Sequence, residues 1–325
     1  MREALTALVV AGLVALPFGA GIAAGADTAE RPLFRFQDPA VVESSGLAVV
    51  GGLVVTVNDS GDEARAFTVD PATGETVGVT RWEGGATDVE AVAPAGDGEV
   101  WVADIGDNAR ARESVSVVRV PVGSGDRSVT GARVELAYPD GPADAEALLA
   151  DPTTGRLLVV TKGVFGGEVY AAPAAPAPGR TQLLRPRGDI MAVVTDGAFL
   201  PDGEHLVLRD YARAVVYSWP GLEPVEEVPL PAQRQGEGIA VGADGDTLLV
   251  STEGQRAPVH EVALPEIGPS AEPTRLSREG RELPQEEAPT SNPWPWLTGL
   301  GVFLVALVVL GFSLRPPRGQ RDHPR

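Results

Sequence analysis

The sequence predicts an all-β fold, a β-propeller of four-stranded blades, and three observations support this. A short phrase that opens a strand recurs five times along the chain. Each copy is followed by a turn rich in Gly, Pro or Asp and then by a run of branched apolar residues, which is typical of a strand, a tight turn and a second strand. No stretch before residue 296 has a convincing helical period. The copies begin at Ser45, Asp88, Asp144, Thr195 and Glu237.

The spacing of the phrases indicates the number of blades. Successive copies lie 43, 56, 51 and 42 residues apart, a range that fits four-stranded blades and is far too long for one coil of a solenoid. Five copies favour five blades. Six blades are the alternative, if the longer second or third repeat contains an additional partial blade.

The last repeat lacks a fourth strand, and this predicts how the ring closes. The first repeat has all four strands of a blade, but the sequence after Leu264 turns into Pro, Ser and Glu. Propellers commonly close by pairing strands from both termini in one blade, which leaves no exposed edge. We therefore expect residues 31–42, with a strand at Leu33 to Phe36, to complete the last blade.

Residues 1–26 have the layout of a secretory signal peptide. An apolar run of 12 residues, 4–15, follows Arg2, and Pro17 and the small residues 24–26 come after it. An uncleaved N-terminal anchor is the alternative, although the run is short for a membrane span.

A second apolar segment predicts a C-terminal transmembrane helix at 294–314. Trp296 to Leu314 are 19 residues without a charge, enough to cross roughly 28 Å as a helix; a buried core helix is the alternative. Arginines follow in the basic tail 315–325, so the positive-inside rule places this tail in the cytoplasm. We expect an extracellular propeller at 27–267 on a disordered, acidic, Pro-rich stalk at 268–293. The protein is then a single-pass monomer of the cell membrane.

The composition excludes several classes of partner and site. The formal net charge is −19, which repels nucleic acid and anionic lipid surfaces and attracts cations. The chain has no cysteine, so a disulfide framework and a thiolate site are both excluded. A large β core must therefore supply the stability of the extracellular domain.

Polar residues at the strand ends are expected to gather at one mouth of the central channel. First strands line the axis of a propeller, and the start of a first strand lies beside the end of the second strand in the same hairpin. A small molecule or a cell-envelope protein is the expected partner at this mouth. The expected ligand-binding residues are Asn58, Asp59, Asp88, Asp104, Asn108, Asp144, Lys162, Arg209 and Glu237.

Carboxylates crowded at one mouth repel each other, and a hard cation with six to eight oxygen ligands would relieve this. Ca²⁺ is therefore the one candidate cofactor. The competing interpretation is a set of ordinary turn acids, because tight turns favour Asp, Asn and Gly. In that case Lys162 and Arg209 neutralise part of the charge. The candidate metal ligands are Asn58, Asp88, Glu90, Asp104, Asn108, Asp144, Glu146 and Glu237.

The sequence assigns no catalytic residue outright. It contains no Gly-x-Ser-x-Gly elbow and no phosphate-binding Gly-rich loop, and His260-Glu261 lacks the second histidine of a zinc motif. If a bound metal polarised a scissile group, Asp104 or Glu146 would act as the general base.

The phrases ending at Asp62, Asn108, Leu148 and Ala240 resemble those of secreted bacterial β-propellers. They are most similar to an actinobacterial group of surface proteins labelled only as WD40-like or membrane proteins, although the Trp-Asp signature of WD40 repeats is absent. A looser likeness runs to the calcium-dependent lactonase and phytase-like esterase propellers. That resemblance implies a calcium ion at the channel mouth, held by Glu, Asn and Asp from several blades.

Three functions follow as expectations. The first is a membrane-anchored extracellular propeller that binds a ligand or a cell-envelope partner through its acidic mouth, with calcium as a candidate cofactor. The alternative is a Ca²⁺-dependent hydrolase of a small ester, lactone or phosphate. A third interpretation is an architectural surface protein without a small-molecule site.

Overall fold

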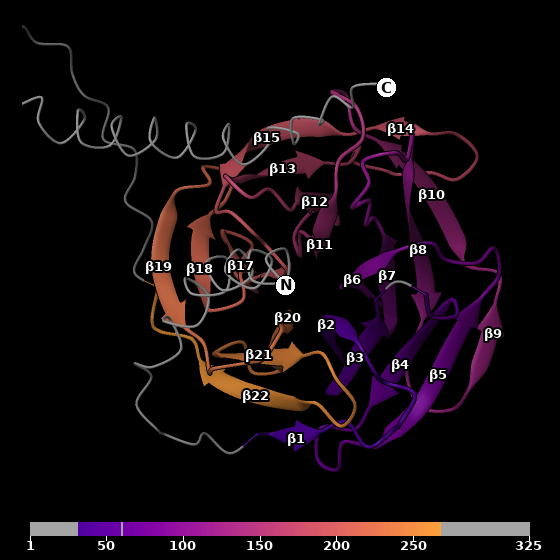
Figure 1. Ribbon diagram of the computed structural model, residues 1–325, viewed down its shortest axis with the longest axis vertical. Helices are drawn as coiled ribbons and strands as arrows, with labels where there is room; N and C mark the ends of the chain where they lie inside the picture. The colour runs from indigo at the N-terminus through magenta and orange to yellow at the C-terminus, as the bar shows by residue number, and fades with distance from the viewer. Residues whose placement is uncertain (1–31, 60, 268–325) are drawn as a thin grey trace, which may run out of the picture. The chain divides into compact units, whose positions relative to one another are not determined.

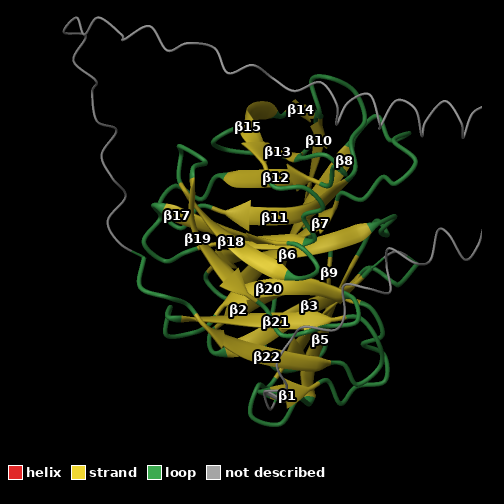
Figure 2. Ribbon diagram, turned by 60° about the vertical axis from the view of Figure 1, so that its left-hand side comes forward, coloured by secondary structure: helices red, strands yellow, loops and turns green. Residues whose placement is uncertain are grey.

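The computed structural model describes residues 32–59 and 61–267, which contain 22 strands and no helix. The strands form five sheets arranged as blades around a central axis (Figure 1). Turned by 60°, the same part of the chain shows only strands and loops (Figure 2). The prediction of an all-β propeller with five blades is confirmed.

Each of the first four blades is formed by one repeat, with its strands in chain order from the axis outward. Blade 1 consists of β2 (Ser44–Val50), β3 (Leu53–Asn58), β4 (Arg65–Val69) and β5 (Thr76–Trp82). Blade 2 consists of β6 (Val89–Gly96), β7 (Glu99–Asp104), β8 (Val115–Pro121) and β10 (Ala132–Ala137). Blade 3 consists of β11 (Ala145–Ala150), β12 (Leu157–Thr161), β13 (Gly167–Ala171) and β15 (Arg185–Ile190). Blade 4 consists of β16 (Asp196–Phe199), β17 (His205–Arg209), β18 (Arg213–Ser218) and β19 (Pro224–Pro229).

Blade 5 joins the two ends of the described chain, as the sequence predicts. Its first three strands from the axis outward are β20 (Gly236–Val241), β21 (Thr247–Thr252) and β22 (Pro258–Ala263), and its outer strand is β1 (Phe34–Arg35). Phe34 pairs with Val259 in an antiparallel register, and Figure 1 shows the indigo β1 beside β22. The ring is therefore closed by pairing of the N-terminal strand with the last repeat.

Apolar side chains on β1 and just after it fix this closure. Phe34 and Phe36 are 6% and 0% exposed and meet edge to face, with ring centroids 5.5 Å apart. The strand also crosses Gly74, where a Cβ would lie 2.0 Å from the carbonyl oxygen of Arg35. Gly74 has a φ of +78°, so both its conformation and this close approach require glycine.

The hydrophobic core is divided among the joints between blades. Five clusters of buried apolar residues are found in the described chain, each drawn from two adjacent blades. The inner strands β2, β6, β11, β16 and β20 contact one another in this cyclic order, and β20 contacts β2. The inner strands thus form a closed ring around the central axis.

The longer second and third repeats do not hide a sixth blade, so that alternative is wrong. Their additional residues form two short strands, β9 (Arg127–Val129) and β14 (Gln182–Leu183). Each adds in parallel to the outer edge of the preceding blade, β9 on β5 and β14 on β10. The additional residues cover sheet edges that would otherwise be exposed.

Several expected segments lie outside the described residues. These are the signal peptide 1–26, the stalk 268–293, the transmembrane helix 294–314 and the tail 315–325. Within 32–59 and 61–267, no helix is long and apolar enough to cross a membrane.

The closure predicts a specific loss of stability. We expect Phe36→Ala to lower the free energy of unfolding by about 3–5 kcal/mol, because a fully buried aromatic ring is removed from the joint between blades 5 and 1. Leu33→Ala is the matched control: Leu33 is 42% exposed, so its loss should change the free energy by about 0.5 kcal/mol or less. Urea denaturation measures both. Equal effects of the two substitutions would show that β1 does not close the ring.

Candidate functional site

The inner strands of four blades begin with a β-bulge. The strand register shifts between Ser44 and Leu47, between Val89 and Ala91, between Ala145 and Ala147, and between Gly236 and Ile239. A bulge re-aims the side chain of the additional residue. In blade 4 the pairing is regular, and Asp196 opposes Arg209. At the start of its inner strand each blade contributes one polar residue, and Gly or Ala follows each of these five residues in the sequence. We call Ser45, Glu90, Glu146, Asp196 and Glu237 the inner ring; all five are buried.

The register corrects the equivalence that the phrases suggest. Counted from the first residue of each phrase, Asp88 and Asp144 are the counterparts of Ser45 and Glu237. In the structure the counterparts are Glu90 and Glu146, two residues later. The phrases match Val92 with Val49, whereas the strand pairing makes Val92 the counterpart of Leu47, since Leu47 pairs with Thr56 and Val92 with Val102, each two residues before the end of its second strand.

Small residues beside the inner ring let the strands approach closely. A Cβ on Gly46 would lie 2.7 Å from the backbone nitrogen of Val92 in the next blade, and one on Gly238 would lie 2.8 Å from Leu47 Cγ.

Asp196 Oδ2 accepts hydrogen bonds from Leu47 N (3.3 Å) and Ile239 N (2.8 Å). Asp196 therefore links three inner strands, and burial raises its pKa well above the usual range.

A second set of polar residues lies next to the inner ring, just before the inner strands and just after the second strands. Backbone hydrogen bonds tie the residue after a second strand to the residue before the inner strand, as in Asp59 N to Glu43 O (3.0 Å), Lys162 N to Asp144 O (2.9 Å) and Glu253 N to Gln235 O (3.0 Å). These bonds bring both segments to the same end of the propeller axis, which we call the mouth. We call Asp59, Asp88, Asp144, Lys162, Tyr211 and Glu253 the outer ring.

Three carboxyl groups from blades 1 and 2 form a cluster at this mouth. One oxygen from each of Asp59, Asp88 and Glu90 lies within 4.8 Å of the others. Burial, with the charges of Asp59 and Asp144, raises the pKa of Asp88 to about 6. Burial, with the charges of Glu146, Asp59 and Asp88, raises the pKa of Glu90 to about 10. The cluster therefore holds fewer negative charges than carboxyl groups near neutral pH.

Gly106 packs directly against this cluster. A Cβ at this position would lie 2.5 Å from Asp88 Oδ2 and 2.5 Å from Glu90 Oε1. Gly106 N also donates to Asp88 O at 3.1 Å, which holds the loop after β7 over the start of β6. Any side chain at this position would displace the carboxyl groups of Asp88 and Glu90, so their arrangement requires glycine at 106.

The opposite side of the mouth contains the one lysine of the chain. Lys162 Nζ lies 2.8 Å from Glu146 Oε1 and 5.7 Å from the centroid of the Tyr211 ring. Burial opposes the charge of Lys162, but Glu146 and Tyr211 outweigh it, so the pKa of Lys162 is raised. Burial raises the pKa of Glu146 and of Glu237 to about 7 each, although Lys162 favours both charges. These two carboxyl groups thus titrate near neutral pH.

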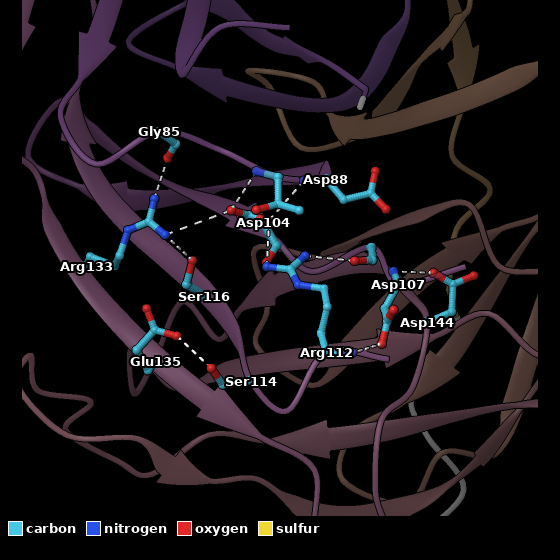
Figure 3. A network of polar contacts seen from close by, with 12 residues as sticks. Gly85, Asp88, Asp104, Asp107, Arg112, Ser114, Ser116, Arg133, Glu135 and Asp144 are labelled. Carbon is cyan, nitrogen blue, oxygen red and sulfur yellow. Dashed lines mark hydrogen bonds and ion pairs between the residues drawn. The ribbon is translucent and has the colours of Figure 1, made fainter. Parts of the chain in front are cut away.

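Asp104 belongs to a structural network and not to the open mouth (Figure 3). Its carboxylate pairs with Arg112 (2.8 Å) and Arg133 (3.9 Å) and accepts hydrogen bonds from the backbone of Thr87 (3.0 Å) and Asp88 (3.1 Å). Asp88 contributes only its backbone to these contacts. Asp104 therefore fixes the segment that leads into β6.

Asn58 has the same function in blade 1. Its Oδ1 accepts from the backbone of Val42 (3.0 Å) and Glu43 (3.2 Å), and its Nδ2 donates to Ala40 O and Asp62 Oδ2, both at 2.8 Å. The side-chain amide is thus engaged in holding the segment before β2.

The other expected residues are divided between the interior and the surface. Arg209 is fully buried, where its guanidinium donates to Gly238 O (3.0 Å) and Ser251 O (3.2 Å) and burial lowers its pKa to about 10. Asn108 is exposed on the turn after β7. Asp144 lies in the outer ring, where its Oδ1 accepts from Asp107 N at 2.8 Å.

The structure therefore brings together part of the expected set. Asp59, Asp88, Glu90, Asp144, Glu146, Lys162 and Glu237 face the mouth, whereas Asn58, Asp104 and Arg209 hold the backbone around it. The sequence-based metal set omitted Asp59, and neither set included Tyr211 or Glu253. The rule that second strands end at the mouth places Asp59 in the ligand-binding set, and it could also have found Tyr211 and Glu253, which lie within two residues of the end of such a strand.

No protein-family model and no curated protein matches this chain. Among solved structures, a glucose dehydrogenase matches with a TM-score of 0.42 and 12% identity, over 72% of this chain and 99% of that one. A gluconolactonase from Xanthomonas campestris matches with a TM-score of 0.42 and 13% identity, over 72% and 89%. A luciferin-regenerating enzyme matches with a TM-score of 0.38 and 12% identity, over 72% and 79%. Likenesses of this size imply no site or activity for this chain.

Substitutions should separate the structural acid from the cluster acid. We expect Asp104→Ala to lower the free energy of unfolding by about 3 kcal/mol, because it leaves Arg112 without its buried partner. Asp88→Asn should leave the stability equal or higher at pH 8, because the neutral amide removes repulsion from Asp59 and Asp144. Urea denaturation with a chelator present measures both. A loss in Asp88→Asn as large as in Asp104→Ala would contradict these assignments.

The raised pKa values also predict how stability depends on pH. Between pH 5 and 7, Glu146 and Glu237 keep protons in the folded chain that they have lost in the unfolded chain. The folded state then binds more protons, so the free energy of unfolding should fall as pH rises, by about 1.4 kcal/mol per pH unit for each such carboxyl at most. Glu90 extends this decline above pH 7.

Urea denaturation in chelator at pH 5, 6, 7 and 8 measures the slope. The carboxyl groups with lowered pKa values, Asp62 and Asp202, act below this window, where their protonation destabilises the fold. Glu237→Gln is the control, since an amide does not titrate and should flatten the slope. Stability that rises from pH 5 to 7 would contradict the pKa directions.

Proposed function

We propose that the channel mouth binds one divalent cation, Ca²⁺, and that the loaded mouth recognises a ligand. The observation that carries this proposal is the cluster of Asp59, Asp88 and Glu90, whose oxygens lie within 4.8 Å of one another. Three carboxyl groups at this separation repel when ionised, and a cation among them replaces that repulsion with attraction.

The chemistry of the donor groups favours a hard cation. The chain has no cysteine, and of the histidines in the described ranges, His205 is paired with Asp202 at 2.7 Å and His260 lies on β22. Among the described residues, the mouth therefore offers carboxylate oxygens and neither a thiolate nor an imidazole as metal ligands. Ca²⁺ accepts such donors in flexible geometry, whereas zinc sites usually contain Cys or His.

Asp59, Asp88 and Glu90 would hold the ion, and Asp144 lies close enough to influence the charge of Asp88. Two of the three ligands are partly exposed, so water can complete the coordination. Binding would also release protons, because a ligating carboxyl must be ionised. Affinity should therefore increase from pH 6 to pH 8.

The sequence supports an extracellular setting for this site. The segments 1–26 and 294–314 have the patterns of a signal peptide and a membrane span, and we infer on that basis a mouth that works outside the cell. Extracellular calcium modules function with dissociation constants of about 10⁻⁴–10⁻³ M. A small molecule or a cell-envelope protein would then be the partner of the loaded mouth.

A Ca²⁺-dependent hydrolase of a small ester, lactone or phosphate is the second candidate, and Glu146 favours it. Burial raises the pKa of its carboxyl to about 7, a value that suits a general base at neutral pH. Both candidates are engaged, Glu146 by Lys162 (2.8 Å) and Asp104 by Arg112 and two backbone N–H groups, so Glu146 is the less constrained of the two. A bound cation would supply Lewis acidity, and Glu146 would accept a proton from water. Turnover of generic esters, lactones or phosphates with calcium present distinguishes catalysis from recognition.

Calcium titration of the full-length chain tests the proposed site. We expect one ion per chain by isothermal calorimetry, with a higher melting temperature in calcium than in chelator. Asp88→Asn should weaken binding at least tenfold. Gly106→Ala should do the same without removing a charge, because its Cβ displaces the carboxyl groups of Asp88 and Glu90.

Asp97→Asn is the matched control for the loss of one charge. Asp97 is exposed on the turn after β6, at the end of that strand opposite Glu90, so binding should not change. The proposal is wrong if the wild-type chain binds no calcium, or if Asp97→Asn weakens binding as much as Asp88→Asn.

A further inference from the structure

The position of Lys162 in the mouth is unusual for a lysine. It is the one lysine in 325 residues, it follows directly after β12, and its side chain is only 25% exposed. Its ammonium lies 2.8 Å from Glu146 Oε1 and faces the Tyr211 ring at 5.7 Å. A flexible, strongly hydrated side chain is thus held inward, beside the inner ring.

Glu237, from blade 5, lacks a comparable partner. It is 4% exposed, and its Oε2 is buried without a hydrogen bond to any described residue. The largest favourable charge that acts on it is that of Lys162, and the largest unfavourable one is that of Glu146. Glu253, above it in the outer ring, is also influenced by Lys162. The positive charge of Lys162 therefore stabilises ionised carboxyl groups from two blades, Glu146 in blade 3 and Glu237 and Glu253 in blade 5.

Arg209, the other cation near Glu237, cannot replace Lys162. Its guanidinium is bound to Gly238 O, Ser251 O and Gln233 Oε1, at 3.0, 3.2 and 3.0 Å. These contacts hold it within the joint between blades 4 and 5. The carboxyl groups of Glu146 and Glu237 are thus influenced by the same ammonium, which is paired with Glu146.

We propose that the Lys162 ammonium occupies a second cation position of the mouth, between Glu146 and Glu237, and thereby limits the protein to one divalent ion. The limit of one ion rests on the proposed calcium site at Asp59, Asp88 and Glu90. A tethered ammonium is present at high local concentration, so a free cation must displace it to bind there. Removal of the ammonium leaves the two buried carboxyl groups, including the unpartnered Glu237 Oε2, for a divalent ion.

Calcium stoichiometry of the full-length chain tests this inference. Lys162→Met, which keeps the length of the side chain and removes its charge, should raise the number of bound calcium ions from one to two. Lys162→Arg is the control, because it retains a positive charge, and it should bind one. Adding Glu146→Gln to Lys162→Met should abolish the second ion and leave the first. If Lys162→Met does not fold, Lys162→Gln replaces it.

The outcomes separate this inference from the proposed function. If Lys162→Met binds one ion and Asp88→Asn abolishes it, the second position does not exist and the first site stands. If the wild-type chain binds none but Lys162→Met binds one that Glu146→Gln abolishes, the second position exists and the first site does not. Two ions in both wild type and Lys162→Arg would overturn the inference.

Discussion

Burial of carboxyl groups around a closed ring is the constraint on which the rest of the site depends. The inner strands approach so closely that Gly or Ala follows each inner-ring residue, and four of those residues are acids: Glu90, Glu146, Asp196 and Glu237. Burial disfavours each charge, and in the mouth neighbouring acids disfavour it further, because a charge loses its hydration and faces another of the same sign. The fold meets this cost in different ways. Asp196 accepts hydrogen bonds from backbone N–H groups of two other inner strands, β2 and β20, and Glu146 pairs with Lys162. In our proposal a cation joins Glu90.

Two kinds of polar residue surround the channel, and their roles follow from what they touch. Asn58, Asp104 and Arg209 are engaged by backbone groups and ion pairs, so they determine where the loops of the mouth lie. Asp59, Asp88 and Glu90 are held by those loops with their oxygens close together. This division resembles that of metal sites in general, where residues behind the ligands orient them. Closely spaced acids, with the backbone behind them held by other polar side chains, are an arrangement suited to binding.

The fold could be predicted from the sequence further than the site could. Five phrases at blade spacing predict five blades, and the missing fourth strand of the last repeat predicts the pairing of β1 with β22. The site follows from the sequence only in part, because the phrases align residues by identity and not by strand partner: the pairing puts Glu90 and Glu146 at the ring position, and not Asp88 and Asp144. Position alone does not reveal which acids or amides the backbone engages, so the sequence also predicts Asn58 and Asp104 as ligands, although both hold backbone groups.

The position of the bound ion is the central claim, and anomalous X-ray diffraction measures it most directly. In crystals grown with Mn²⁺ in place of Ca²⁺, the account predicts one strong anomalous peak among the carboxyl oxygens of Asp59, Asp88 and Glu90, with Lys162 still paired with Glu146. Crystals in which the mouth contains no peak, or in which the ion lies on another face of the propeller, would contradict it.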